Sequence, residues 1–556
     1  MRSTERKKRG GALLAAASLL GLFATAAVAP TAAVAQTAPA PAAQPGRQID
    51  TRVARPTDLP GLEAQNGVLP LSLEQAVTIA VRQNLGLVIE RYTRQQSRLG
   101  ITQSMGIYDL LARANLTHTD SQQATLDVFQ ANQSEDDNLS FSFLQRLPTG
   151  GDVSFGWASG RSETPEDPRR PGITTSYTSG ATFSFSQPLL RDFGRLVNER
   201  NILVARFNDR ISREEFERQV TLLTQQVINA YLSLVEARQQ LGVAQESLNL
   251  ARELHDRNRI QVEVGTLAPL ELVQSEAAIA TRDEDIIRST STVGDAADDL
   301  RQLLNLPPGP LWEAEIQPTT EQQVEPVTIN VEQAIETAFA ERPEVRTQEI
   351  ALERFRLDSL FFRNQMRPNL DLNLRYNPTG FGIGFSDALD QITGFEFPTW
   401  SVSLDFSYPI QNRAARAASA IADIDVDRAG AQLEQQRTVV ATEVRQAARA
   451  VETALKQIDA SRISREFQEK NLDAERKRYE NGMSTSFQIT QIQEELTRAR
   501  SREVSSVITY RRTLVEYYRA TGRLLEVEGI GIDDPRTPER PVDWWSFDRD
   551  LFPEEE

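Results

Sequence analysis

One proline-free stretch limits the folds open to this chain more than any other feature. From Gly194 to Val264 there is no proline, and the only interior glycine is Gly242. Ala, Leu, Gln, Glu and Arg dominate the stretch, and all of them favour helix. About 70 residues at 1.5 Å each give a helix of roughly 100 Å, against a usual length of about 11–12 residues. Such a helix needs long helical neighbours to bury its apolar stripe.

A turn and a returning helix follow this stretch. Gly265 permits the left-handed backbone that ends many helices, and Pro269 suits the first turn of a new one. The next proline-free segment runs from Leu270 to about Leu306. We therefore expect a long helical hairpin.

The second half of the chain contains the same pattern. Residues 413–480 lack proline and have a single glycine, and a return helix is expected over 487–521. Gly482 lies in the turn between them, 217 positions after Gly265. This spacing indicates an internal repeat of one helical-hairpin unit.

The N-terminus and the composition indicate an exported protein. Residues 1–35 have a basic start, an apolar segment and an Ala-Val-Ala cleavage site, which predicts a signal peptide; the alternative is a membrane anchor. Residues 36–70 form a Pro- and Ala-rich linker. The chain has no cysteine, which excludes disulfides and a lipidated N-terminal cysteine, and its net charge of −17 argues against nucleic-acid binding.

Short capped helices and a connector complete the predicted domain organisation. Ser72 with Gln75, and Asn330 with Gln333, predict two N-caps before apolar helix faces. We expect a first repeat over residues 71–306, a connector over 307–328, a second repeat over 329–532 and an acidic tail over 533–556.

Alternating strands lie between the helices of each half. In the second half one face of two expected strands is apolar, with a Gly-rich loop expected over 380–394, and we predict that this face contacts lipid: Leu370, Leu372, Leu374, Trp400, Val402, Leu404 and Phe406. Strands of about 9–11 residues span a bilayer when tilted. The first half offers candidate strands over 112–125, 139–143, 153–157 and 183–188, with a turn at Pro148–Gly151.

Residues for catalysis are not evident. The two histidines, His118 and His255, are far apart in the sequence; a metal or triad role is possible for them, but ordinary surface positions fit the pattern better. There is no phosphate-binding glycine loop and no Gly-x-Ser-x-Gly elbow. We expect no enzyme activity, no cofactor and no metal.

Long helices and bilayer-length strands in one exported chain suggest a tube. In a bilayer only helical bundles and closed barrels satisfy the backbone. The few strands expected here cannot close a conducting barrel alone, so several chains must contribute. The alternative is a periplasmic coiled-coil adaptor or scaffold without a pore, which leaves the strands unexplained.

At the level of motifs the chain resembles the TolC-like outer membrane efflux proteins over about residues 71–525. The resemblance rests on the duplication, the Leu-Glu-Gln-Ala-Val opening at 73–77, the Ser-Gln-Pro-Leu-Leu strand end at 186–190, and Gly265 and Gly482. It implies an α+β membrane protein built from two repeats and closed by trimerisation. In such a homotrimer a long α-helical coiled-coil barrel continues a transmembrane β-barrel.

The same resemblance implies a function and partners. The protein would be the outer membrane exit duct of a tripartite efflux or type I secretion system in a Gram-negative-type bacterium, extending into the periplasm. It would conduct substrates passively from a periplasmic adaptor (membrane fusion protein) and an inner-membrane transporter.

Two features depart from the family pattern. An Asn-Pro pair often opens the helix after the first short one; here the two copies read Asn84-Leu85 and Arg342-Pro343, so each keeps half. Family members usually supply two strands per repeat. The extra hairpin across Pro148–Gly151 therefore either enlarges the barrel or folds outside it.

The resemblance also places two candidate sites at the helical tips. An adaptor-docking tip is expected at Gly265, Thr266, Pro269, Gly482 and Met483. A gate is expected at Glu271, Gln274, Tyr479, Gln488 and Gln491, where the usual acidic ring of the second repeat is replaced by glutamines. Glu271 has a simpler alternative, since a carboxylate at a helix start is favoured by the helix dipole.

Overall fold

The structure is a computed structural model that describes residues 67–122, 133–164, 174–320 and 324–531. The expected signal peptide, most of the linker and the acidic tail lie outside these residues. Within them, no helix combines the length and the apolar character needed to cross a membrane.

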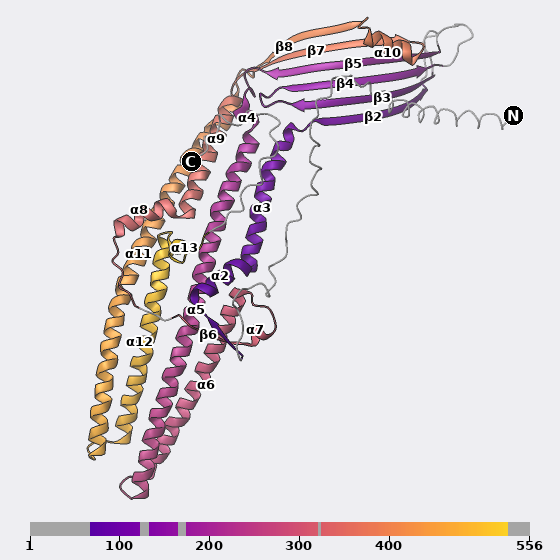
Figure 1. Cartoon of the computed structure of the whole chain (residues 1–556). Coiled ribbons are helices and arrows are strands. Elements are labelled where there is room, and N and C mark those ends of the chain that lie inside the picture. The colour runs from indigo at the N-terminus through magenta and orange to yellow at the C-terminus, as the bar shows by residue number, and fades with distance from the viewer. Residues whose placement is uncertain (1–66, 123–132, 165–173, 321–323, 532–556) are drawn as a thin grey trace, which may run out of the picture. The chain divides into compact units, whose positions relative to one another are not determined.

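Two long helical hairpins dominate the described residues (Figure 1). The first pairs α5 (Arg200–Glu263) with α6 (Leu270–Leu304), and the second pairs α11 (Arg413–Glu480) with α12 (Ser486–Ala520). The hairpins predicted from the proline-free stretches are therefore confirmed, with boundaries within a few residues of those expected.

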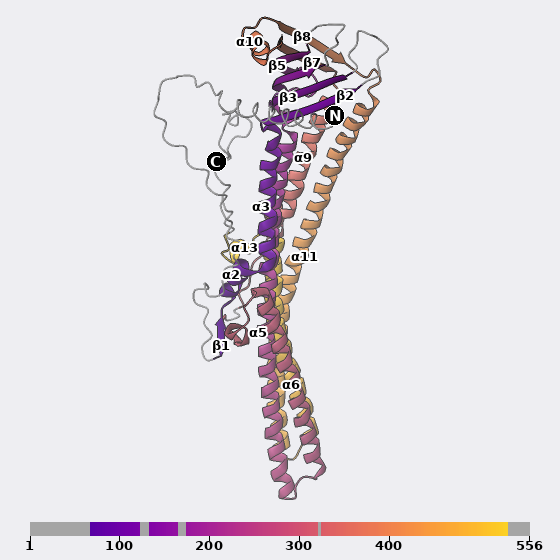
Figure 2. The same ribbon diagram turned by 90° about the vertical axis from the view of Figure 1, so that its right-hand side faces the viewer.

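The long helices lie side by side in one layer. Near the sheet the order of contacts is α3 (Leu85–Met105), α5, α9 (Pro343–Gln365) and α11. Toward the tips it is α6, α5, α12 and α11. Helices α3 and α6 therefore form one edge of the layer and α11 the other, and Figure 2 views the layer from the α3 and α6 edge.

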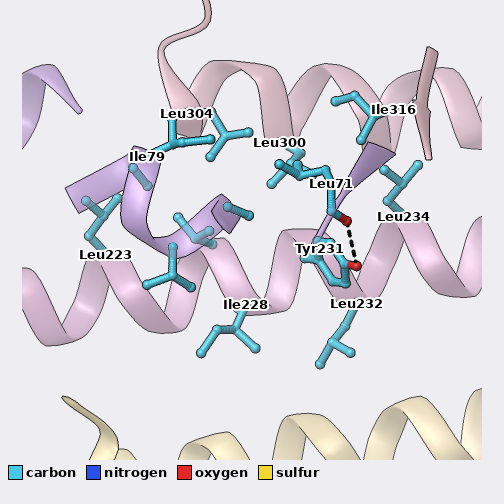
Figure 3. Close-up of a cluster of buried hydrophobic side chains, with 14 of the residues drawn as sticks. Leu71, Ile79, Leu223, Ile228, Tyr231, Leu232, Leu234, Leu300, Leu304 and Ile316 are labelled. Carbon is cyan, nitrogen blue, oxygen red and sulfur yellow. Dashed lines mark hydrogen bonds between the residues drawn. The ribbon is translucent and has the colours of Figure 1, made fainter. Parts of the chain in front are cut away.

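The main hydrophobic core lies where the segment from Leu69 to Leu87 meets the middle of α5 (Figure 3). Strand β1 (Val68–Leu71) pairs in parallel with β6 (Glu315–Pro318), and the Tyr231 hydroxyl donates to the Leu71 carbonyl at 3.0 Å. The end of the linker and the connector thus contribute a two-stranded sheet and helix α7 (Pro310–Glu313), which the sequence pattern did not predict. These segments are ordered because Leu69 and Ile316, each 1% exposed, are buried in the core.

The predicted helix caps are present. Ser72 and Gln75 form the full capping box of α2 (Leu73–Gln83), and the Asn330 side chain accepts from two backbone amides of α8 (Val331–Glu341). The divided Asn-Pro pair has a structural explanation. Asn84 caps α3 with its side chain, whereas Pro343 opens α9 as its first residue.

Arg342 precedes that proline and is 4% exposed. Its guanidinium lies 2.5 Å from Glu443 and 3.2 Å from Glu344, which ties α9 to α11. Burial opposes the ionisation of Glu344, but the hydrogen bond and charge of Arg342 outweigh that effect and lower the pKa of the Glu344 carboxyl.

Six antiparallel strands of the described residues form one sheet in the order β2, β3, β4, β5, β7 and β8. Their bounds are β2 Leu111–Gln122, β3 Gln133–Arg146, β4 Asp152–Glu163, β5 Thr175–Pro188, β7 Asn369–Gly382 and β8 Pro398–Ser407. The remaining short elements are η3 (Gly106–Tyr108), α4 (Arg195–Asn198), α10 (Phe385–Thr393) and α13 (Leu524–Val527).

The structure bears on two predictions about this sheet. The prediction of a Gly-rich loop over 380–394 is wrong, because β7 extends to Gly382 and helix α10 follows it. Glycine at 380 allows the Ala388 carbonyl oxygen to approach, since a Cβ there would lie 1.9 Å from it. The hairpin across Pro148–Gly151 pairs with β2 on one side and with β5 on the other, so it lies within the sheet.

Candidate functional site: the helical tips and the sheet

Both hairpin tips end in the same turn. At the first tip the Thr266 amide donates to the Gln261 carbonyl at 2.9 Å, and the Gly265 amide to the Val262 carbonyl at 3.0 Å. This is the Schellman arrangement, which needs a left-handed residue, and Gly265 has φ of +80°.

At the second tip Met483 donates to Arg478 at 2.8 Å and Gly482 donates to Tyr479 at 2.9 Å. Gly482 has φ of +72°. The two tips are thus conformational equivalents, and the aligned glycines have the same structural task.

The five residues expected to dock an adaptor are all exposed at these turns: Gly265, Thr266, Pro269, Gly482 and Met483. Met483 is 62% exposed, and a Cβ built on either glycine would have no neighbour within 4 Å. The tips therefore offer open surface to another molecule.

Tyr479 is the one buried residue among the five expected at the gate. It is 6% exposed and packs with Leu254, Leu472 and Ile489. Its hydroxyl lies 2.7 Å from Asn258 Oδ1 and 3.0 Å from Gln261 Oε1, both on α5. Burial, and then the charge of Glu271, raise the pKa of the Tyr479 phenol, so it stays a neutral donor that joins the two hairpins.

Glu271 also joins the hairpins. Its carboxylate accepts from the hydroxyl of Ser486, the first residue of α12. Gln274, Gln488 and Gln491 are exposed within the first two turns of the two return helices. The expected gate residues thus fall into two groups, a pair that ties the hairpins together and three glutamines on the surface.

Ion pairs reinforce the connection between the hairpins. Arg257 lies 3.2 Å from Glu480, and Arg282 lies 3.1 Å from Glu494. The first pair is about half exposed on both sides, so it contributes less than the buried Tyr479 bond.

Sequence reasoning missed Asn258, Gln261 and Ser486. A signal for Asn258 exists, because Leu250, Leu254 and Asn258 recur every four residues on the buried stripe of α5. A polar residue that continues an apolar stripe indicates a buried polar partner.

The sheet has one apolar and one polar face, as its alternation predicts. On one face Tyr376 pairs with Trp400 and Leu372 with Leu404, while on the other Asn373 pairs with Ser403. The apolar face continues across every strand: Ala114 and Leu116, Phe141 and Phe143, Phe155 and Trp157, Phe183 and Phe185, Leu370, Leu372 and Leu374, and Trp400, Val402, Leu404 and Phe406. Leu404 is 63% exposed and Trp400 72%.

The two histidines lie in separate places. His118 Nδ1 is 2.8 Å from Asp137, with Glu135 nearby, and Arg161 also donates to Asp137. His255 Nδ1 is 2.9 Å from the Ser275 hydroxyl, between α5 and α6. The two histidines do not meet among the described residues, whereas His118, Glu135 and Asp137 bring their ligand atoms within 4.8 Å of one another.

A sheet with two unlike faces, continued by a layer of long helices, defines an outer membrane channel fold. Solved structures share it. The Campylobacter jejuni CmeC outer membrane channel is 14% identical with a TM-score of 0.60, covering 81% of this chain and 86% of that one. The VceC outer membrane protein of Vibrio cholerae is 12% identical with a TM-score of 0.59, covering 81% and 96%. The open-state Neisseria gonorrhoeae MtrE outer membrane channel is 17% identical with a TM-score of 0.56, covering 81% and 89%.

The family model described as "outer membrane efflux protein" matches residues 149–306 and 334–523. The chain belongs to this family, and the TolC-like resemblance is confirmed. No curated protein matches the sequence. The family and the structural neighbours are channels rather than enzymes, and this chain is an efflux-type outer membrane channel protein.

Proposed function

We propose that the protein is the exit duct of a tripartite efflux or type I secretion system. It would conduct substrates passively through the outer membrane from a periplasmic adaptor and an inner-membrane transporter. The observation that carries this proposal is the six-stranded sheet, apolar on one face and polar on the other, whose strands continue directly into the helical layer. Such a sheet suits lipid on one side and an aqueous lumen on the other.

The edges of the sheet support its closure by further copies of the chain. Among the described residues β2 and β8 each pair on one side only, which leaves two rows of unpaired backbone groups. Exposed backbone of this kind cannot remain in a bilayer. In our proposal β8 of one copy pairs with β2 of the next, and three copies close a shared β-barrel.

The helical layer has matching edges near the sheet. Helix α3 exposes Ile89 (61%) and Leu99 (58%), and α11 exposes Ile421 (59%) and Ile424 (63%). Apolar side chains on both edges favour contact between neighbouring copies. The same trimer would thus continue the barrel as a long α-helical coiled-coil barrel into the periplasm.

The tips take the docking and gating roles in this proposal. The exposed Schellman turns at Gly265 and Gly482 contact the adaptor. In our proposal the bonds of Tyr479 and Glu271 hold the two hairpins together when the duct is closed. In a trimer Glu271 recurs three times around the axis, where clustered carboxylates attract cations.

Outer-membrane fractionation together with a gel assay of assembly tests the proposal. We expect the protein in the outer membrane fraction, migrating as a trimer in a denaturing gel until it is heated. A soluble periplasmic protein that runs as a monomer without heating would instead support the adaptor or scaffold alternative.

A further inference from the structure

The two halves of the chain differ in the number of strands that they place in the sheet. In the second half β7 follows α9 and β8 leads into α11, and these two strands pair directly. In the first half β2 follows α3 and β5 leads into α5 in the same way, but β3 and β4 lie between them. The β3–β4 hairpin is therefore an insertion into a plan that the second half carries without it.

The inserted hairpin continues both faces of the sheet. On the apolar face Phe141 stacks on Trp157 with ring centroids 6.0 Å apart, and Phe155 lies 4.8 Å from Phe183 of β5. On the polar face the middle of the hairpin carries small residues, and a hollow of about 960 Å³ is lined by Ser142, Gly156 and Ala158 among others. The hairpin is therefore built as a section of wall with a lipid side and a water side.

The turn of the hairpin is fixed to the junction with the helices. The Gly194 amide donates to the Thr149 carbonyl at 3.0 Å, and the Gln187 side-chain amide donates to the same carbonyl at 3.2 Å. These bonds anchor the hairpin at the end of the sheet where β5 passes into α4 and α5.

The sheet is as wide as the helical layer beside it only when the β3–β4 hairpin is included. Four helices spaced by about 8–10 Å cover roughly 32–40 Å of a ring. Six strands about 4.8 Å apart and tilted by about 40° cover roughly 38 Å, whereas four strands cover roughly 25 Å. The helical layer beside the sheet contains four helices, so a six-stranded sheet continues it without a step in width.

We propose that the β3–β4 hairpin widens the outer-membrane pore of this protein, an inference that rests on the trimeric duct proposed above. Three copies of the six-stranded sheet place eighteen strands in the wall, with a backbone radius of about 18 Å. Twelve strands, as the second half's plan alone would give, correspond to about 12 Å. The wider mouth suits cargo of large cross-section, such as unfolded or compact polypeptides, as well as small solutes.

Because the insertion adds an even number of strands, the strands on either side of it keep the same face of the sheet outward. Ala112 pairs with Phe143, which pairs with Phe155, which in turn pairs with Phe183. All four residues lie on the apolar face. Deletion of residues 123–173 would therefore set Ala112 opposite Phe183 with the same face outward.

Single cysteines test whether the hairpin is wall, since the natural chain has no cysteine to interfere. In intact outer membranes we expect a charged, membrane-impermeant thiol reagent to modify Ala158→Cys at least tenfold faster than Trp157→Cys. The matched pair Ser403→Cys and Val402→Cys in β8 tests the duct itself. If the β8 pair alternates and the hairpin pair does not, the widening is refuted alone; if the β8 pair fails to alternate, the proposed duct fails.

Polymer exclusion tests the width. With polyethylene glycols of graded size added from the cell-surface side of a planar bilayer, the full chain should admit polymers into the mouth up to a radius about one and a half times that of the 123–173 deletion. An unchanged cut-off in an assembled deletion trimer would overturn the proposal. Should the deletion fail to assemble, the thiol-reactivity pairs decide the question on the full chain.

Discussion

Removal of one hydroxyl at the tip, in the Tyr479→Phe variant, should shift the protein toward its open state. The phenylalanine ring keeps its contacts with Leu254, Leu472 and Ile489, so the packing of the tip is preserved. What disappears is the hydroxyl that lies within hydrogen-bond distance of Gln261 and of Asn258, a residue that is 0% exposed. The variant thus isolates one polar link between α5 and α11.

The size of the effect follows from the burial of Asn258. A hydrogen bond contributes about 0.5–1.5 kcal/mol net, and an unsatisfied buried acceptor costs about 1–3 kcal/mol. If the hairpins separate in the open state, Asn258 is hydrated there and the cost falls on the closed state alone. The ratio of open to closed channels should then rise roughly 5- to 150-fold.

Single-channel recording in planar bilayers measures this ratio directly. The matched control is Tyr510→Phe, which also removes a buried hydroxyl but one that donates to the Glu325 carbonyl at 2.5 Å, away from the tip. We expect the control to open as rarely as the unaltered protein. Equal open probabilities in all three proteins, or an equal rise in both variants, would refute the idea that Tyr479 holds the closed state.

Four further predictions concern the sheet, the tips and the helical layer. Leu404→Arg should destabilise the assembled trimer by roughly 2–4 kcal/mol while Ser403→Arg leaves it intact on a gel, and equal loss from both would contradict the assignment of the faces. Gly482→Asp should abolish export but leave trimer in the membrane, and normal export would remove the docking proposal. Glu271→Gln should weaken cation selectivity and block by multivalent cations from the periplasmic side, and unaltered selectivity would place the charge elsewhere. Because folding lowers the pKa of the Glu344 carboxyl, its ionised form stabilises the fold at pH values above its ordinary pKa of 4.5, and this stabilisation disappears as the pH falls through the lowered pKa. Glu344→Gln should therefore flatten that part of a plot of melting temperature against pH. An unchanged plot would contradict the role of its ion pair.

The sequence determined the elements and the aligned tips of this protein. Freedom from proline over α5 and α11, and glycine at 265 and 482, are local properties of the backbone, so the hairpins could be predicted closely. Strand alternation likewise depends only on the two-residue period of an extended chain, and it placed Leu404 and Ser403 on opposite faces of the sheet.

The tertiary structure decided what those elements touch. The pairing of β3 and β4 inside the sheet requires partners on both sides that no local pattern specifies. The link from Tyr479 to Asn258 joins residues 221 positions apart, and the strand pairing of Leu71 with Pro318 spans a comparable distance in the chain. Such contacts depend on which side chains become buried together, and that is set by the packing of distant segments rather than by the residues near them in the sequence.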